Sequence, residues 1–354
     1  MKQNSNIKSI AALAGVSPST VSRVLNQSAG VSDELRERVM NAINVTGYTI
    51  NPMASTLKST KRNQIAIVIP SLRKNYYVDI IRAASLCCYE RGIMPVILES
   101  SGDPSEEIEI IRRLETQWID GIIFVPSKAG KLSRDAVASL SSLSKQQERI
   151  PVVLVESETL NPLVDCVRVD YQYGFYTLAR HILETGRKKL AYLCGEKDAT
   201  AFHMSLCGVK QALEEHGMVL EDRYVVCGGF KVIDGYRCMN DLVSRGIPFD
   251  AVICANDQMA SGALGACREH GLEVPGDVAL AGFGGVALSA ITTPPITTMV
   301  VPSSQLGYRA AMLLFERINN RIEQAEEIVM KPVLAVRPST LDTAAVSFES
   351  MLNE

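Results

Sequence analysis

The sequence predicts an α/β protein in two parts: an N-terminal all-α helix-turn-helix head, and a body of two lobes that are each built on a doubly wound parallel sheet. Three observations lead to this prediction. Residues 7–26 contain two short amphipathic helical patterns separated by a glycine. From residue 64 onward, short apolar runs alternate with helical stretches. The order of strands and helices in the first half of this region then recurs in its second half.

Length and composition limit the broad class of the protein. The 354 residues suffice for two or three domains, and 47% hydrophobic with 21% charged residues is typical of a soluble globular chain. No apolar run reaches the length of a membrane span and the first residues open no secretory signal, so we expect a cytoplasmic protein without a membrane partner. The nine cysteines contain no C-x-x-C pair, which favours reduced thiols over a disulfide framework or a zinc site.

The patterns in residues 7–26 (IKSIAALAGVSPSTVSRVLN) are those of two short helices that pack against each other. Gly15 ends the first pattern, Ser17 is a good N-cap for the second helix, and Pro18 occupies its first position, where a missing N–H costs nothing. Two helices joined by a glycine turn are typical of a helix-turn-helix whose second helix enters the DNA major groove, and an ordinary helical hairpin is the alternative. The positions expected to face inward are Ile10, Ala11, Ala14, Val21, Val24 and Leu25.

A third amphipathic helix is expected to begin at residues 31–32, and the string GYTINPMASTLKSTKR follows at residues 47–62. The segments VSPSTVSRVLN (16–26) and GYTINPMASTL (47–57) resemble the lactose/galactose repressor family, whose N-terminal region reads V-S-x-x-T-V-S-R-V-L-N and then G-Y-x-x-N-x-x-A-x-x-L. The resemblance continues along nearly the entire chain. It implies a transcriptional regulator, expected to be a repressor, that binds a near-palindromic operator in double-stranded DNA as a homodimer and is controlled by a small metabolite.

Charge is distributed unevenly along the chain. The formal net charge is −3, yet residues 1–62 carry eight basic and three acidic residues, which leaves the head at +5 and the body at −8. A basic head on an acidic body suits contact of the head alone with DNA phosphates, and such binding weakens as salt rises.

The resemblance places base contacts at the start of the second helix and at its arginine. Arg23 is able to pair bidentately with a guanine edge, which is the strongest single contact available there. Pro18 has no side-chain donor or acceptor, so it contacts a thymine methyl or shapes the helix entry. The hydroxyls on this helix serve bases and phosphates, or they only cap the helix and face solvent. The residues expected at DNA from this region are Ser17, Pro18, Ser19, Thr20, Ser22, Arg23 and Asn26.

Residues 51–58 (NPMASTLK) form a helical segment that is too short to be stable alone in water. The resemblance implies that two copies pair on DNA, insert Leu57 into the minor groove and kink a central base step. A linker with one exposed leucine is the alternative. The basic pair at residues 61–62 favours the DNA role, for which the candidates are Asn51, Ala54 and Leu57.

The body opens with apolar runs at residues 65–69, 94–98, 121–125 and 152–155, and corresponding runs recur at residues 190–194, 224–226, 251–254 and 278–283. Helical stretches separate them, as in a parallel doubly wound sheet. Such a repeat predicts two similar lobes with a ligand cleft at the carboxyl ends of their strands. The resemblance implies the same body, which is similar to the periplasmic sugar-binding proteins.

The resemblance also implies three crossings between the lobes, near residues 161–162, 293–295 and 321–327, which together would form a hinge. The tail lacks a sustained leucine heptad, so we expect a dimer rather than a helical tetramer. The expected division is a head (1–50), a hinge helix and linker (51–62), a first lobe (63–162 with 293–323), a second lobe (163–292 with 324–342) and a tail (343–354).

Effector candidates come from strand ends of both lobes, as the resemblance implies. Two positions depart from the family pattern. Ser205 stands where the family usually has an arginine. The family's strand-end sequence Gly-Phe-Asp-Asp is Gly-Phe-Gly-Gly in this chain, so Gly284 replaces an aspartate. The first-lobe candidates are Ser71, Arg73, Tyr76, Tyr77, Ser100 and Ser127, and the second-lobe candidates are Asp170, His203, Ser205, Asn256 and Gly284.

Loss of a guanidinium and a carboxylate together suggests an unusual effector or an unusual pose. The basic residues Arg73, Lys74, Lys128, Lys197 and His203 favour an anionic carbohydrate derivative, such as a sugar acid or a sugar phosphate. Solvated loop charges are the alternative explanation. A neutral sugar, or no retained effector, also stays open.

Catalytic motifs are lacking. Residues 282–287 fit the dinucleotide pattern G-x-G-x-x-A, but they lie in the last strand of the second lobe, and no acidic residue follows about 20 positions later. There is no G-x-S-x-G elbow, no Walker loop and no H-E-x-x-H, so we expect no enzyme, no cofactor and no metal. The rival function is a solute-binding receptor without a DNA role, and the N-terminal helix-turn-helix counts against it.

Overall fold

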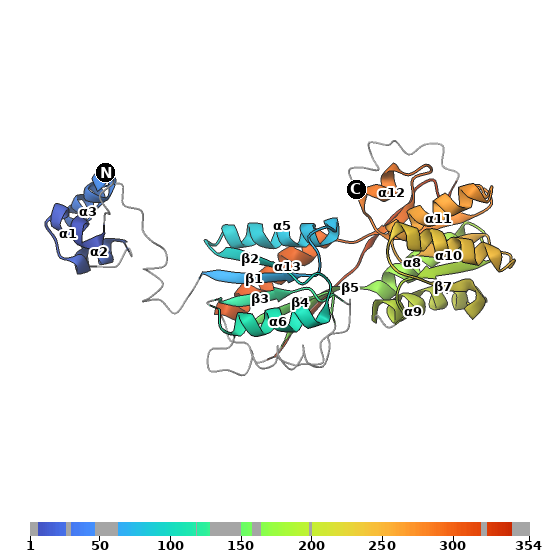
Figure 1. The fold of residues 1–354 in the computed structure, drawn as a ribbon, viewed down its shortest axis with the longest axis horizontal. Coiled ribbons are helices and arrows are strands. Elements are labelled where there is room, and N and C mark those ends of the chain that lie inside the picture. The colour runs from blue at the N-terminus through green and yellow to red at the C-terminus, as the bar shows by residue number, and fades with distance from the viewer. Residues whose placement is uncertain are drawn as a thin grey trace. The chain divides into compact units, whose positions relative to one another are not determined.

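The structure is a computed structural model that describes residues 6–25, 30–46, 63–117, 119–127, 150–157, 164–197, 200–319 and 324–341. The chain divides into two compact units, Met1–Arg62 and Asn63–Glu354, which are the head and the body (Figure 1). In the described ranges, no helix is both long enough and apolar enough to cross a membrane.

The head consists of helices α1 (Ile7–Ala14), α2 (Pro18–Leu25) and α3 (Asp33–Thr46) around a small core. The two helices expected in residues 7–26 are confirmed. Five of the six positions expected to face inward are buried and Leu25 is half-buried, so helical periodicity located this core correctly. The buried residues of the head are Ile10, Ala11, Ala14, Val21, Val24, Val39 and Ala42.

The turn between α1 and α2 depends on Gly15 and Arg38. Gly15 has φ 62°, and the Val16 N–H donates to the Ala11 carbonyl at 2.9 Å, which closes the end of α1. The Arg38 guanidinium of α3 donates from Nη2 to the Ala14 carbonyl at 2.7 Å. A Cβ added at Gly15 would lie 2.7 Å from Arg38 Nη2, so the glycine serves both the backbone conformation and this close approach.

The first lobe is a six-stranded sheet in the order β11-β5-β4-β3-β1-β2, and every strand pairs in parallel with its neighbour. Along β1, alternate residues serve two cores: Ile65, Ile67 and Ile69 face α5 and α13, whereas Ala66 and Val68 face α6. The elements are β1 (Gln64–Ile69), α5 (Asn75–Tyr89), β2 (Met94–Glu99), α6 (Pro104–Glu115), β3 (Gly121–Phe124), β4 (Val152–Val155), β5 (Asp165–Val169), α13 (Ser303–Asn319) and β11 (Glu327–Met330).

The second lobe repeats this plan in the order β12-β10-β9-β8-β6-β7, with only β12 antiparallel. Helix α8 packs on α9, and α10 packs on α11. The elements are α8 (Tyr171–Glu184), β6 (Leu190–Cys194), α9 (Thr200–Glu215), the 3₁₀ turn η1 (Asp222–Tyr224), β7 (Val225–Cys227), α10 (Val232–Ser244), β8 (Ala251–Cys254), α11 (Asp257–Glu269), β9 (Ala279–Gly284), α12 (Ala287–Ile291), β10 (Thr297–Val300) and β12 (Val333–Ala335).

The chain crosses between the sheets after Val169, after Val300 and after Met330. The crossings expected near residues 161–162, 293–295 and 321–327 are therefore placed too early. The family resemblance implied those positions, but strand pairing decides the boundary. Strands β5 and β11 pair into the first sheet, whereas β10 pairs with β9 in the second.

The expectation that all cysteines are reduced thiols is wrong for one pair. Cys194 at the end of β6 and Cys227 at the end of β7 form a disulfide, and the other seven cysteines are free. The strand register places the two residues opposite each other, with Cα atoms 4.5 Å apart. They lie 33 residues apart in sequence, so only the strand pairing reveals the bond.

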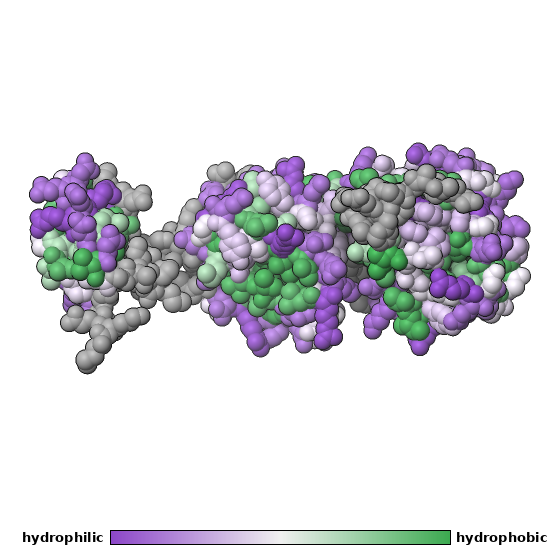
Figure 2. Space-filling view, turned by 90° about the horizontal axis from the view of Figure 1, so that it is seen from above, coloured by the Kyte–Doolittle hydropathy of each residue, from purple (hydrophilic) through white to green (hydrophobic). Residues whose placement is uncertain are grey.

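An apolar surface lies at the free edge of the first sheet. Strand β2 is the edge strand, and five exposed side chains cover it and the end of α5. Figure 2 shows apolar side chains gathered on this lobe. An exposed apolar edge strand of this kind is usually covered by a partner. The residues of this edge surface are Leu86, Tyr89, Met94, Val96 and Ile97.

Candidate functional site

Helix α2 presents the residues expected to contact DNA on its exposed face, while its opposite face packs into the core of the head. Val21 and Val24 are buried in the head core, while Ser17, Pro18, Ser19 and Arg23 are exposed. Thr20 and Ser22 are half-buried. The helix contains no acidic side chain, so its exposed surface can approach phosphates without charge repulsion.

The hydroxyls at the start of α2 already bond to one another. The Thr20 N–H donates to Ser17 Oγ at 3.1 Å, and Ser17 Oγ lies 2.7 Å from Ser19 Oγ and 2.8 Å from Thr20 Oγ1. The capping role considered for these hydroxyls is thus present in the free head. The remaining candidates Asn26, Asn51, Ala54 and Leu57 lie outside the described residues.

The body brings the effector candidates toward one place, because the three crossings are short. One residue separates β5 from α8, and two residues separate both β10 from α13 and β11 from β12. Each crossing leaves the carboxyl end of a strand, so the carboxyl ends of the two sheets lie next to each other. Ligands of open α/β sheets bind at this edge. We refer to it as the interlobe edge.

Glu156 lies at the interlobe edge, and the sequence did not suggest it. It follows β4 directly, with φ 62°, a left-handed conformation that non-glycine residues rarely adopt and that concentrates at functional sites. Its carboxylate lies against Tyr76 of α5 in the first lobe and Tyr171 of α8 in the second. The sequence signal that could have indicated Glu156 is a carboxylate placed immediately after a buried apolar strand.

The electrostatics of this group follow from burial. Burial raises the pKa of Glu156, and the hydroxyls of Tyr171 and Tyr76 offset the effect only in part. Burial and the nearby Glu156 raise the pKa of Tyr77 to about 12, and they raise those of Tyr76 and Tyr171 well above the usual value. The site therefore presents neutral phenols around one buried acid.

Three buried polar side chains at this edge lack a hydrogen bond of normal geometry within the described residues. They are the Tyr76 hydroxyl, the Ser127 hydroxyl and both carboxylate oxygens of Glu156. All three come from the first lobe, at or just beyond the carboxyl ends of its strands. Buried polar groups are ordinarily bonded, so these atoms stand out among the described residues.

The other first-lobe candidates differ in exposure and in hydrogen bonding. Ser71 accepts from the Arg73 N–H at 3.2 Å, and Ser100 is buried with its Oγ donating to the Ile69 carbonyl at 3.4 Å. Arg73 is exposed, and so are Lys74 and Lys197, whereas Lys128 lies outside the described residues. Tyr77 packs edge-to-face on Tyr76, with ring centroids 5.3 Å apart.

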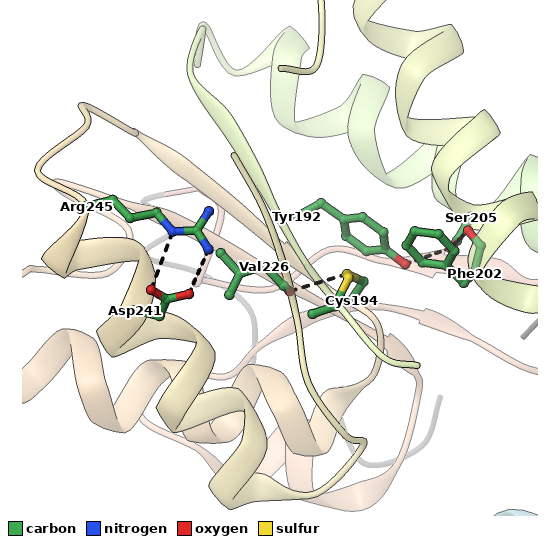
Figure 3. Close-up of a disulfide and its surroundings, with 8 residues drawn as sticks. Tyr192, Cys194, Phe202, Ser205, Val226, Asp241 and Arg245 are labelled. Carbon is green, nitrogen blue, oxygen red and sulfur yellow. Dashed lines mark hydrogen bonds and ion pairs between the residues drawn. A yellow bond between two sulfur atoms is a disulfide. The ribbon is translucent and has the colours of Figure 1, made fainter. Parts of the chain in front are cut away.

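In the second lobe, Ser205 does not reach the surface. It is buried, its Oγ donates to the Phe202 carbonyl at 2.8 Å, and it lies 2.7 Å from the Tyr192 hydroxyl (Figure 3). His203 is exposed on α9, beside the Phe202 ring. Where an arginine is usual in the family, this chain thus has a closed internal hydrogen bond.

Asn256 and Asp170 each cap a helix. Asn256 Oδ1 accepts from the Met259 N–H at 2.8 Å, and its Nδ2 donates to the Phe230 carbonyl at 3.0 Å. Asp170 accepts from the Tyr173 N–H at 2.9 Å, and its own N–H donates to the Met330 carbonyl, which joins two of the crossings. Phe230, 38% exposed, is a further residue that the sequence did not suggest.

Gly284 carries no carboxylate, but one lies nearby. Asp257 of α11 is buried and accepts from Thr298 Oγ1 at 2.6 Å and from the Val286 N–H at 2.8 Å. Burial raises its pKa to about 6, although these donors act in the opposite direction. A Cβ at Gly284 would approach Asp257 Oδ2 to 3.4 Å, so this acid holds the turn after β9.

Comparison with known proteins supports both halves of this description. Residues 6–51 match the bacterial regulatory proteins of the lacI family, and residues 179–340 match the periplasmic binding protein-like domain. The HTH-type transcriptional repressor PurR of Mannheimia succiniciproducens is 32% identical over 333 residues, which cover 94% of this chain and 98% of that protein. The HTH-type transcriptional regulator DegA of Bacillus subtilis is 30% identical over 334 residues, covering 94% and 97%.

Two solved structures are similar over almost the whole chain. A complex of the transcriptional regulator CelR with cellobiose has 28% sequence identity and a TM-score of 0.70, covering 95% of this chain and 100% of that one. The lac repressor dimer bound to operator and the anti-inducer ONPF has 23% identity and a TM-score of 0.84, covering 96% and 100%. At 23% identity, the similarity to the lac repressor structure is evidence for the fold alone.

Proposed function

This chain belongs to the lacI family of bacterial regulatory proteins, and from that premise we propose which of its residues bind DNA, a second copy and an effector. It is a DNA-binding transcriptional regulator with a helix-turn-helix head and an effector-binding body, and it is not an enzyme. Its relatives are repressors that act on DNA, so we place its activity in the cytoplasm, where the chromosome is.

The DNA contacts are assigned to α2 and to the segment after α3. Arg23 pairs with a guanine edge. Nearby bases and phosphates are contacted by Ser17, Pro18, Ser19, Thr20, Ser22 and Asn26. The minor groove is contacted by Asn51, Ala54 and Leu57. Exposure of Arg23 above the buried Val21 and Val24 supports this assignment. Two heads read half-sites about one helical turn apart.

The second copy is assigned to the edge surface of Leu86, Tyr89, Met94, Val96 and Ile97. These side chains are between 37% and 65% exposed, which is unusual for a continuous apolar edge strand. A homodimer that covers this edge places two heads on one operator. The lac repressor structure similar to this chain is a dimer on its operator.

The effector is assigned to the interlobe edge. The observation that carries this assignment is the buried Glu156 carboxylate, which lies against Tyr76 of one lobe and Tyr171 of the other without a hydrogen bond of normal geometry. Hydroxyl groups of a carbohydrate satisfy acceptors and donors of this kind, and the related CelR binds cellobiose. An acidic group on a sugar acid or sugar phosphate would face the exposed Arg73 and Lys74, away from Glu156.

Glu156 also suggests how the effector acts. It contacts Tyr76 of the first lobe and Tyr171 of the second, so it lies between the parts that move relative to each other. An effector hydroxyl that donates to Glu156 replaces the contact with Tyr171 and changes the preferred angle between the lobes. The spacing of the two DNA-binding segments in the dimer changes with it.

The test starts with selection from a random duplex pool by purified full-length protein, followed by sequencing. An enriched near-palindrome identifies the operator, whereas no enrichment at low salt, with and without candidate metabolites, would contradict the DNA assignment. Thermal shift with neutral sugars, sugar acids and sugar phosphates then identifies an effector class. Loss of the shift in Glu156→Gln, with the shift retained in the surface control Glu214→Gln, is the result expected for the proposed site.

A further inference from the structure

The disulfide Cys194–Cys227 lies at the carboxyl ends of β6 and β7, on the edge of the second sheet that borders the first lobe. Both loops that leave these strands begin at the next residue. Figure 3 shows Cys194 of β6 beside Val226 of β7. Tyr192 lies on the same strand as Cys194, and its hydroxyl lies beside Ser205. A covalent bond at this position restrains two neighbouring loops at once.

The loop after Cys227 is the one that carries Phe230. A Cβ at Gly195 would overlap the Phe230 ring, so the ring lies directly over the loop that follows Cys194. The Phe230 carbonyl accepts from Asn256 Nδ2 at 3.0 Å. Residues 227–230 are therefore held at one end by the disulfide and at the other by Asn256.

The sheet itself does not require the disulfide. The Gly228 N–H donates to the Cys194 carbonyl at 2.9 Å, and β6 pairs with β7 along its length. The Cys194 sulfur lies 3.3 Å from the Val226 carbonyl, which is available as an acceptor for a thiol. Reduction therefore leaves the strands paired and removes the covalent restraint on the loop beyond Cys227, which keeps its backbone bond at Gly228 and its bond from Asn256.

The two cysteine residues differ in exposure. Cys194 is fully buried, whereas Cys227 is half-buried. Cys238 lies beside Gly228, but burial raises the pKa of its thiol, which keeps it a poor nucleophile. Cys227 is therefore the more accessible of the two residues to an external thiol.

We propose that Cys194 and Cys227 form a thiol–disulfide exchange site through which the low-molecular-weight thiol pool controls the Phe230 loop at the interlobe edge. An external thiolate attacks Cys227 Sγ, the bond to Cys194 breaks, and the Cys194 thiolate takes a proton. A second external thiol then resolves the mixed disulfide, so two thiols are oxidised to one disulfide while the protein gains two thiols. Disulfides in the compartment of a DNA-binding regulator are usually of this exchangeable kind.

Control of effector affinity by this exchange rests on the proposed effector site, whereas the exchange and the loop release do not. Full-length protein is equilibrated in glutathione buffers of increasing oxidised fraction, quenched with acid, and then alkylated in denaturant so that the buried cysteines react. We expect nine alkylated cysteines in the reduced protein and seven in the oxidised one, with the missing pair mapped to Cys194 and Cys227. Nine alkylated cysteines at every ratio, including pure glutathione disulfide, would overturn the proposal.

Hydrogen exchange of residues 228–231 reports on the loop. We expect reduction to accelerate exchange there by roughly tenfold or more, while β8 stays protected. Cys227→Ala and Cys194→Ala should exchange fast under both conditions, and Cys267→Ala, which removes a buried free thiol of the same lobe, should behave like the unmodified protein. Equal exchange in the oxidised and reduced protein would also overturn the proposal.

The effector that thermal shift identifies provides the final readout. Oxidised and reduced protein should differ in affinity for it by roughly fivefold or more, and the two cysteine variants should show no such difference. If thiol exchange and loop release occur and no effector or operator is found, the proposed function fails while the exchange site stands. Equal affinity of both forms for an identified effector would overturn the regulatory step.

Discussion

The carboxylate of Glu156, at the end of a first-lobe strand, lies next to the hydroxyl of Tyr171, the first residue of the second-lobe helix α8. Tyr171 in turn stacks on Phe283 of β9, with ring centroids 5.5 Å apart. A group of the first lobe is thus linked through one tyrosine to the core of the second. This link is short and includes a buried acid, so we expect it to respond both to a ligand and to pH.

Glu156→Gln tests this link. Burial raises the pKa of Glu156 in the folded chain, so the folded state retains a proton that the unfolded state loses, and stability falls as pH rises above the ordinary glutamate value of about 4.3. Glutamine removes this fall and weakens effector binding by roughly tenfold or more. Thermal unfolding between pH 5 and pH 8 measures the first effect, and titration with the identified effector measures the second. The same pH slope in the variant as in the original chain would contradict the assignment.

Asp257 predicts a second pH dependence. Its pKa is about 6 in the folded chain, against about 3.9 when unfolded, so its contribution decreases stability as pH rises from about 4 to about 6. We expect the stability advantage of the original chain over Asp257→Asn to shrink by about 2–3 kcal/mol between pH 4 and pH 7.5. Urea unfolding at both pH values measures this change. The exposed Asp222→Asn, which removes a carboxylate of the same lobe, is the control.

Reduction of the disulfide should lower the stability of the second lobe. The bond closes a loop over a sequence separation of 33 residues, for which chain entropy predicts roughly 3–4 kcal/mol. Urea unfolding with and without dithiothreitol measures the difference. Cys194→Ala combined with Cys227→Ala should unfold identically in both conditions. A reductant effect that persists in this double variant would show that another cysteine pair is responsible.

Arg38→Met tests the packing of the head. The variant loses the guanidinium bond to the Ala14 carbonyl at 2.7 Å, so we expect about 1 kcal/mol less stability of the head. Hydrogen exchange of α1 and α2 in the full chain measures this loss. Arg36→Met removes the same charge from the same helix without that bond, and it should leave exchange in the turn unchanged.

Arg23→Met tests the reading of DNA. Arg23 is exposed, so the variant should keep the stability of the original head while losing about 1–3 kcal/mol of binding to the selected operator. Fluorescence anisotropy at fixed salt measures the affinity. Lys8→Met, an exposed charge on α1, should weaken binding to all sequences alike. Unchanged discrimination between operator and random duplex in Arg23→Met would contradict base contact by Arg23.

Local sequence patterns were sufficient to predict the helices and strands and to identify the family. The capped start of α2 at Ser17-Pro18, the Gly15 turn and the periodicity of Val21 and Val24 depend only on neighbours in the chain, so sequence alone located the head and its core. The same applies to the apolar strands of the body. Departures at Ser205 and Gly284 were also visible, but their consequences were not.

Contacts between distant residues required the tertiary structure. Strand pairing assigned β5 and β11 to the first lobe and brought Cys194 to Cys227, which no local signal predicts. Burial made Glu156 the central acid of the interlobe edge and gave Asp257 a pKa of about 6. The physical reason is that periodicity and capping act over a few residues, whereas desolvation and pairing depend on which surfaces meet. The sequence by itself thus determined the elements and the family, and only the tertiary structure decided which side chains face one another between the lobes.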